Sequence, residues 1–108
     1  MADTALRLYG PAQPGTGNAT LYTVPGATTC VIRHMRVMNT TGSAATISVA
    51  INGTAATAAN CLLYAFSIPA NSVYDWTGFI PLAAADTIQG LQGTGSALTV
   101  TIGGVEST

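Results

Sequence analysis

Hydrophobic and polar residues alternate along most of this chain, and short turn sequences separate the alternating runs. Residues 45–51 place Ile47, Val49 and Ile51 on one face, and residues 97–102 repeat the pattern. Side chains of a strand point alternately to its two faces, so this period of two predicts half-buried β-strands. No segment sustains the 3.6-residue period of an amphipathic helix, and we therefore expect little helix.

Turn sequences such as Pro25-Gly26 and Asn52-Gly53 mark where the expected strands end. The strands are expected at residues 5–9, 20–24, 28–39, 45–51, 61–68, 73–80, 87–89 and 97–102. The Ala-rich residues 54–60 predict a loop or one helical turn. Seven to eight short strands at this spacing predict an all-β protein: a single-domain antiparallel β-sandwich with a jelly-roll-like fold.

The first eighteen residues differ from the rest. Residues 10–18 are rich in Pro and Gly, which indicates a linker after the first short strand. We therefore divide the chain into an N-terminal arm and linker at residues 1–18 and a β-sandwich domain at residues 19–108. Two interpretations of the first strand stay open: an arm that reaches a neighbouring subunit, or an ordinary edge strand followed by a loop.

The charge content limits the possible partners. Only 6% of the 108 residues are charged, and none is lysine, whereas a typical soluble domain has about 25%. Little repulsion then keeps copies apart, so we expect a subunit of an assembly and a homo-oligomer, with a trimer favoured. Three dispersed arginines cannot form a nucleic-acid surface, and no apolar run approaches the length of a membrane span. Residues 1–4 do not resemble a secretory signal, so synthesis in a cytoplasm is expected.

The residues capable of site chemistry are few. In a regular strand His34, the single histidine, shares a face with Cys30, Ile32 and Arg36, and Cys61 could lie opposite. Three candidate ligands without a paired motif do not make a zinc site, so no metal or cofactor is expected. The chain has one imidazole and no GxSxG motif, so no catalytic residue is assigned. Both cysteines are expected to be buried and reduced.

Alternation also predicts the direction of several polar and aromatic side chains. Trp76 is expected to fill the core and Asp75 to point outward; the alternative is a sugar-binding patch formed by Tyr74, Asp75 and Trp76. Arg33 and Arg36 are expected on opposite faces of one long strand. Because charges are scarce, each arginine is expected to meet a carboxylate, either in its own fold or across a subunit boundary; the alternative is an ordinary exposed arginine.

Five segments together resemble small virion proteins of tailed bacteriophages. They are residues 22–29 (YTVPGATT), 31–42 (VIRHMRVMNTTG), 67–78 (SIPANSVYDWTG), 82–88 (LAAADTI) and 98–106 (LTVTIGGVE). The resemblance covers about residues 20–106. Ala85 departs from it, because a glycine is expected in the turn before Asp86. Asp86 itself is expected to cap this turn with its side chain.

The resemblance implies a non-enzymatic structural protein. The leading interpretation is a capsid decoration protein that binds the major capsid protein on the capsid surface. The alternatives are a minor tail or tail-tip protein, and a carbohydrate-binding module on the virion. Candidate interface residues are Leu6, Leu8, Tyr9, Arg33, Arg36 and Trp76.

Overall fold

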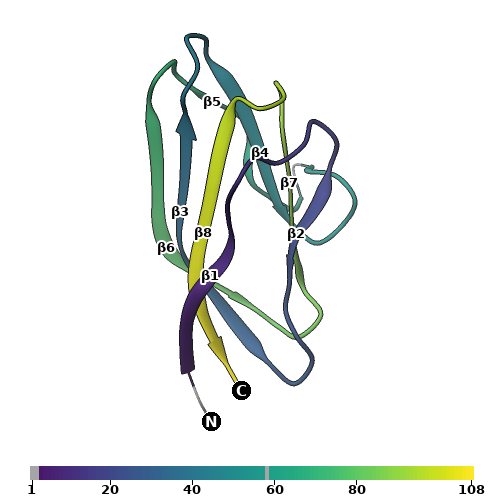
Figure 1. Ribbon diagram of the computed structural model, residues 1–108. Coiled ribbons are helices and arrows are strands. Elements are labelled where there is room, and N and C mark those ends of the chain that lie inside the picture. Colours follow the sequence, from purple (N-terminus) through teal and green to yellow (C-terminus); the bar gives the residue numbers. More distant parts are fainter. Residues whose placement is uncertain (1–2, 58) are drawn as a thin grey trace.

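The computed structural model describes residues 3–57 and 59–108, which form eight β-strands and no helix (Figure 1). The strands are β1 (Asp3–Ala12), β2 (Ala19–Thr23), β3 (Thr29–Asn39), β4 (Ala45–Ile51), β5 (Cys61–Ile68), β6 (Val73–Leu82), β7 (Thr87–Gln92) and β8 (Leu98–Ser107). Each strand expected from alternation is present. Since none of the described residues forms a helix, no helix of that part could cross a membrane.

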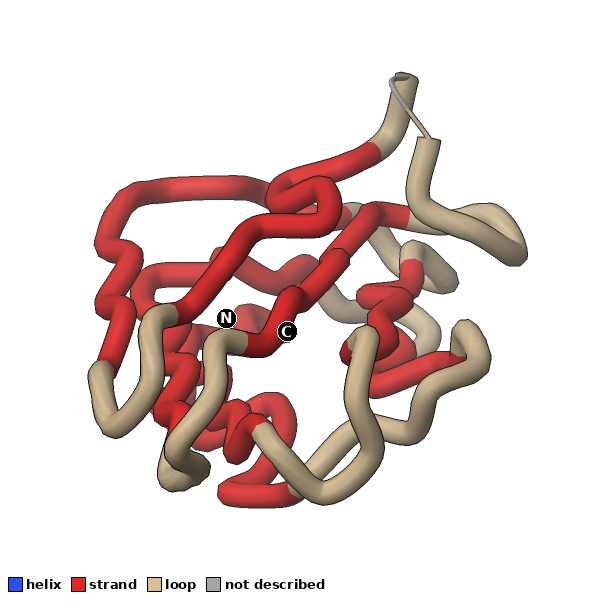
Figure 2. Tube along the Cα trace, turned by 90° about the horizontal axis from the view of Figure 1, so that it is seen from above, coloured by secondary structure: helices blue, strands red, loops and turns tan. Residues whose placement is uncertain are grey.

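The strands form two antiparallel four-stranded sheets packed face to face. The first sheet has the order β1-β8-β3-β6 and the second has the order β2-β7-β4-β5. Each sheet therefore combines strands that are distant in the sequence, which is the arrangement of a jelly roll. Figure 2, which views the molecule from above, shows the two layers around the core and the two termini side by side. The jelly-roll expectation is confirmed.

The inward-facing side chains of the two sheets form one core. The largest of those with 1% exposure or less are Ile32, Met35, Val37, Ile47, Val49, Ile68, Ile88, Leu98, Val100 and Ile102. Burial of each such side chain contributes about 1.5–3 kcal/mol relative to exposure. Most are β-branched, which suits a pleated, half-buried surface.

The first strand is an edge strand of the sandwich. β1 pairs antiparallel with β8 of the same chain, from Asp3 opposite Ser107 to Ala12 opposite Val100. Leu8 is 7% exposed and packs in the common core. Of the two interpretations of this segment, the isolated chain therefore adopts the edge strand. It also continues through Ala12, three residues beyond the strand expected from the sequence.

The segment after β1 is held against the sandwich by a buried glutamine. Gln92 is fully buried, and its side-chain Nε2 donates to the carbonyl of Pro14. Its Oε1 accepts from the backbone N–H groups of Ala97 and Leu98, at 3.2 and 2.8 Å. One amide thus ties the expected linker to the turn before β8. Buried polar groups require such partners, since an unsatisfied one costs about 1–3 kcal/mol.

Candidate interaction surface

The large exposed hydrophobic side chains gather on one side of the sandwich. Among the described residues they are Tyr64 (64% exposed) and Phe66 (38%) on β5, and Val73 (45%) and Phe79 (65%) on β6. β5 and β6 are the edge strands of the two sheets, and Phe66 contacts Tyr74 of β6 with ring centroids 4.7 Å apart. We call the exposed surface of these two strands the β5–β6 side.

This side lacks one of the usual protections of sheet edges, which is charge. Soluble proteins commonly place lysines or other charges on edge strands to prevent association. β5 contains no charged residue, and β6 contains one, Asp75. A bulge does interrupt β5, where Ala65 has φ 46° and its N–H donates to Ser48 Oγ at 2.8 Å. The bulge disturbs strand addition along β5, so the β5–β6 side suits packing by side chains.

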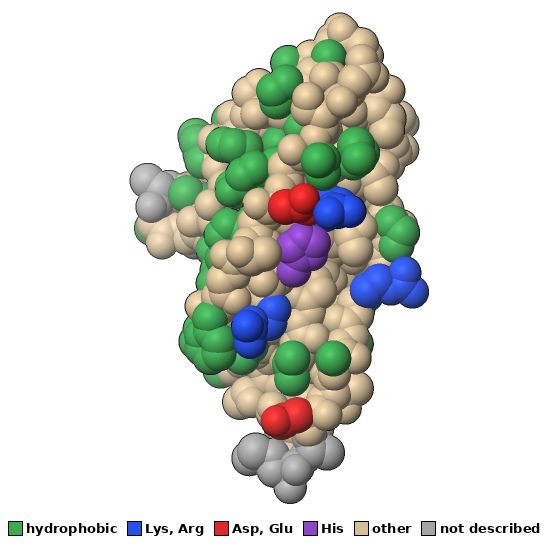
Figure 3. Space-filling model, turned by 90° about the vertical axis from the view of Figure 1, so that its left-hand side faces the viewer, with side chains coloured by type: hydrophobic (Ala, Val, Ile, Leu, Met, Phe, Trp, Pro, Cys, Tyr) green, Lys and Arg blue, Asp and Glu red, His purple; other side chains and the backbone are tan. Residues whose placement is uncertain are grey.

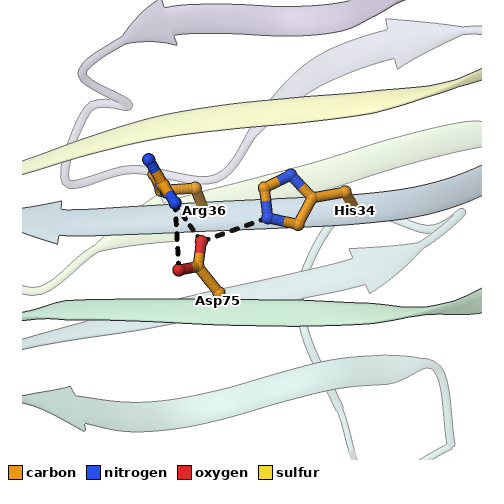
Figure 4. Close-up of polar contacts among 3 residues, drawn as sticks. All are labelled: His34, Arg36 and Asp75. Atoms are coloured by element: carbon orange, nitrogen blue, oxygen red, sulfur yellow. Dashed lines mark hydrogen bonds and ion pairs between the residues drawn. The ribbon is translucent and has the colours of Figure 1, made fainter.

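Three polar side chains form one cluster on the outer face of the first sheet (Figure 4). Arg36 on β3 lies directly opposite Asp75 on β6 and donates through Nε at 2.7 Å and Nη2 at 3.1 Å. His34 Nε2 lies 3.1 Å from Asp75 Oδ1. The hydrogen bond from Arg36, followed by the contact with His34, holds the pKa of Asp75 below its ordinary value.

Figure 3 shows this cluster on the face that carries β6, with hydrophobic and neutral side chains around it and the two other arginines of the chain on the same face. The cluster is exposed to solvent: the side chain of Arg36 is 54% exposed and that of Asp75 is 38%. An exposed pair of this kind contributes little to stability. The cluster instead gives this surface a defined polar feature with its charges paired, between two arginines that have no carboxylate partner within the described residues.

Irregular pairing around β3 shows that two expectations from the sequence, the faces of the arginines and of His34, are wrong. The inward positions Ile32 and Met35 are three residues apart, because the register shifts between Ile32 and His34. Arg33 and His34 consequently both face outward, as Arg36 does. The arginines therefore share the outer face instead of lying on opposite faces, and His34 does not share a face with Cys30 and Ile32.

Glycine in the neighbouring strand accommodates this irregularity. A Cβ added at Gly104 of β8 would lie 2.2 Å from the carbonyl oxygen of Val31. Only glycine allows the backbones of β3 and β8 to approach so closely here. The pair Gly103-Gly104 was visible in the sequence, but its role depends on which strand lies beside it.

Arg33 is fixed in the part of this surface that adjoins Phe79. Its Nε donates to the carbonyl of Gly78 at 3.1 Å, and its guanidinium carbon lies 5.9 Å from the centroid of the Phe79 ring. That distance permits a cation–π interaction. The Nη atoms make no hydrogen bond within the described residues.

The other candidate interface residues lie elsewhere. Leu8 is in the core, and Leu6 and Tyr9 pack partly against it. Trp76 is likewise half-buried against the core, while Asp75 points outward, as alternation predicts. Trp76 therefore does not form the exposed sugar-stacking surface considered above.

Tyr64 and Phe66 were not identified as candidates from the sequence. The run CLLYAFSI does not alternate clearly between hydrophobic and polar positions, so it reveals no outward face. Phe79 stands four residues after Asp75, so alternation places both on the outward face of the strand, but nothing in the sequence pairs that strand with β5. The only signal of this surface in the sequence was that residues 61–68 contain no charged residue.

The cysteines and the remaining carboxylates form no metal-binding arrangement in residues 3–57 and 59–108. Both cysteines are free; Cys30 is buried and Cys61 half-buried, so the expectation of burial holds fully only for Cys30. Asp86 caps its turn as expected, accepting from the N–H of Ala83 at 2.8 Å. This bond, with one from Asn52, lowers the pKa of Asp86.

The architecture places the chain among jelly-roll proteins, a fold used by viral capsid, lectin and cupin domains. A chain in the structure of infectious bursal disease virus, Gx strain, matches it with a TM-score of 0.51 at 8% sequence identity. The match covers 97% of this chain and 31% of that chain, so this protein spans about a third of the viral chain's length. At this identity the similarity shows the fold alone.

Two further solved structures are more distant. One is a pentameric capsid protein isolated from metagenomic phage sequences (TM-score 0.38, 16% identity, 98% of this chain and 59% of that one). The other is a CBM35 from Paenibacillus barcinonensis (TM-score 0.38, 11% identity, 98% and 88%). TM-scores this low support no argument about function. No protein-family model matches the sequence, and no curated protein matches it.

Proposed function

We propose that this protein is a structural subunit of a virus particle, and specifically a bacteriophage decoration protein that binds the outer surface of the capsid. The observation that carries the proposal is the β5–β6 side: large hydrophobic side chains exposed together on two edge strands that charge does not protect. Exposed apolar surface gathered in this way marks an interaction site. The jelly roll, common among capsid proteins, is consistent with this role.

The mechanism is mechanical and requires no catalytic residue. A small homo-oligomer, with a trimer favoured, straddles contacts between neighbouring copies of the major capsid protein. Binding of each subunit to a different capsid protein makes the attachments cooperate through effective concentration, so weak single contacts add up to firm attachment. Each bound oligomer then favours the assembled shell over its separated subunits, because it binds the assembled shell only.

The test is quantitative mass spectrometry of purified particles separated into heads and tails. Hundreds of copies on heads are expected for a decoration protein. A few copies on tails would overturn decoration and place the subunit in a tail or tail-tip role. Absence from both fractions would overturn the virion proposal.

A further inference from the structure

The carboxylates of this protein are already bonded within its own fold. Asp3 accepts from Ser107 Oγ at 2.6 Å, Asp75 from Arg36 at 2.7 Å, Asp86 from the Ala83 N–H at 2.8 Å, and Glu106 from the Tyr22 hydroxyl. These four residues are all the aspartates and glutamates in the chain. A second copy of the chain therefore offers no Asp or Glu side chain that lacks a partner in its own fold.

Arg33, unlike the carboxylates, has no oppositely charged partner within the described residues, where the ion pairs involve Arg36 and His34 only. Its bond to the Gly78 carbonyl and its position over Phe79 restrict the side chain before any partner arrives. A guanidinium held in this way binds a carboxylate through two parallel N–H donors, and the prior ordering lowers the entropy cost of binding.

We propose that the β5–β6 side docks on a different protein, whose Asp or Glu carboxylate binds Arg33 and whose apolar side chains pack on Phe79 and Tyr64. The inference rests on the proposed function, in which that partner is the major protein of the shell. Charge complementarity favours this partner: the surface offers an arginine without a carboxylate partner beside apolar rings, and each Asp or Glu of the chain already has a bond within its own fold. Contacts between copies of this chain then use another surface.

Nucleic acid does not fit this surface. Binding of a phosphate backbone relies on several clustered cations, and its strength rises with the number of phosphates neutralised. Here Arg36 is paired with Asp75, which leaves Arg33 on the β5–β6 side and Arg7 across the sheet on β1, too few cations for a phosphate backbone. A single carboxylate is enough to pair with Arg33.

The experiment uses purified particles from a phage whose gene for this protein is deleted, with the recombinant full chain added back. The readout is the protein concentration at half-maximal occupancy. Arg33→Glu is expected to raise this concentration about 30-fold or more, because it replaces attraction by repulsion at a desolvated contact. Phe79→Ser is expected to raise it about tenfold through loss of the exposed ring. Both side chains are exposed, so the fold is expected to persist, as circular dichroism can verify.

Arg7→Glu is the matched control, since Arg7 is also exposed and lies on β1 at the opposite edge of the same sheet. It is expected to bind as the wild type does. Equal weakening by Arg7→Glu, or wild-type occupancy with Arg33→Glu and Phe79→Ser, would overturn the docking proposal while leaving the proposed function intact. Failure of the wild type itself to bind would instead overturn the proposed function.

Sedimentation velocity of the free protein tests whether a second copy of the chain binds the β5–β6 side instead. The oligomeric state is expected to be the same for wild type, Arg33→Glu and Phe79→Ser. If either substitution dissociates an oligomer, the β5–β6 side is a contact between copies of this chain, and the docking proposal is wrong.

Discussion

Ala85 adopts a backbone conformation that glycine accepts more readily. Its φ is 71°, in a turn closed by a hydrogen bond from the Asp86 N–H to the Ala83 carbonyl. A positive φ at the third position of such a turn belongs to type II, which favours Gly there. The resemblance to phage virion proteins led us to expect Gly at this position, and the structure supplies the physical reason.

Ala85→Gly is therefore expected to raise the free energy of unfolding by about 0.5–1 kcal/mol, because relief of the left-handed conformation outweighs the added freedom of the unfolded chain. Ala84→Gly is the control, because Ala84 precedes it in the same turn without a positive φ. That change should lower stability by about 0.5 kcal/mol. Urea unfolding measures both, and a loss of stability with Ala85→Gly would contradict the turn geometry.

The lowered pKa of Asp75 makes the polar cluster sensitive to acid. A carboxyl whose pKa is lower in the folded state stabilises the fold above its unfolded pKa, and this contribution disappears as the pH falls through the folded pKa. Arg36→Gln is expected to raise the pKa of Asp75 toward its ordinary value, because it removes the main cause of the shift. Carboxyl carbon NMR shifts followed against pH measure this.

Arg33→Gln is the matched control for that titration, because Arg33 binds the Gly78 carbonyl and not Asp75. It should leave the pKa of Asp75 unchanged. An equal rise in both variants would mean that general positive charge, and not the paired hydrogen bonds, sets the pKa.

At the scale of the element, β1 shows how an edge strand is held. Leu8→Ala is expected to lower the free energy of unfolding by about 2–3 kcal/mol, since Leu8 is buried in the core. Leu6→Ala on the same strand should cost about 1 kcal/mol or less, because Leu6 is only partly buried. Chemical denaturation distinguishes the two. Equal costs would mean that β1 does not dock through Leu8.

Most strands could be predicted from the sequence, because alternation is a local property of each strand. β4 and β5 have the expected ends, and β3 differs by one residue at its start. The register shift near Arg33 leaves a trace in the sequence, because two polar residues, Arg33 and His34, separate Ile32 from Met35, but this trace alone does not fix the register. The shift arises from pairing with β6 and β8, which are far away in the sequence. Both wrong face assignments follow from that one irregularity.

The interaction surface was less accessible to sequence analysis than the fold. Its residues come from β5 and β6, and they become neighbours only because each strand is the last of its sheet. Sheet order depends on long-range packing, so the sequence could show that Phe79 points outward but not what stands beside it. The low charge content indicated that such a surface exists, without locating it.

For the whole molecule, side-chain hydrogen bonds such as that from the Leu98 N–H to Gln92 connect the two sheets, and Tyr22 makes another. Tyr22 on β2 of the second sheet donates to Glu106 on β8 of the first. Burial, and then the bond to Glu106, raises the pKa of Tyr22, because a phenolate there would be poorly solvated and would face a carboxylate. The hydroxyl therefore remains a donor at neutral pH.

Tyr22→Phe is expected to lower the free energy of unfolding by about 1–2 kcal/mol, the value of a hydrogen bond to a charged acceptor. Tyr64→Phe is the control, since Tyr64 is 64% exposed, and it should change stability by less than about 0.5 kcal/mol. Thermal unfolding compares the two variants. If they are equally stable, the bond from Tyr22 to Glu106 contributes nothing.

The pairing of Asp3 with Ser107 brings the two ends of the described chain together, at the edge of the first sheet opposite β6. A short flexible linker between the ends would turn β1 and β8 into a hairpin. New ends could then be opened in the exposed residues 93–96 without removing a strand. A circular permutant of this kind would keep both sheets and the β5–β6 side. Cargo fused next to the start of β1 or the end of β8 would likewise attach at the edge opposite β6, which makes the protein a candidate scaffold for displaying foreign domains on a particle.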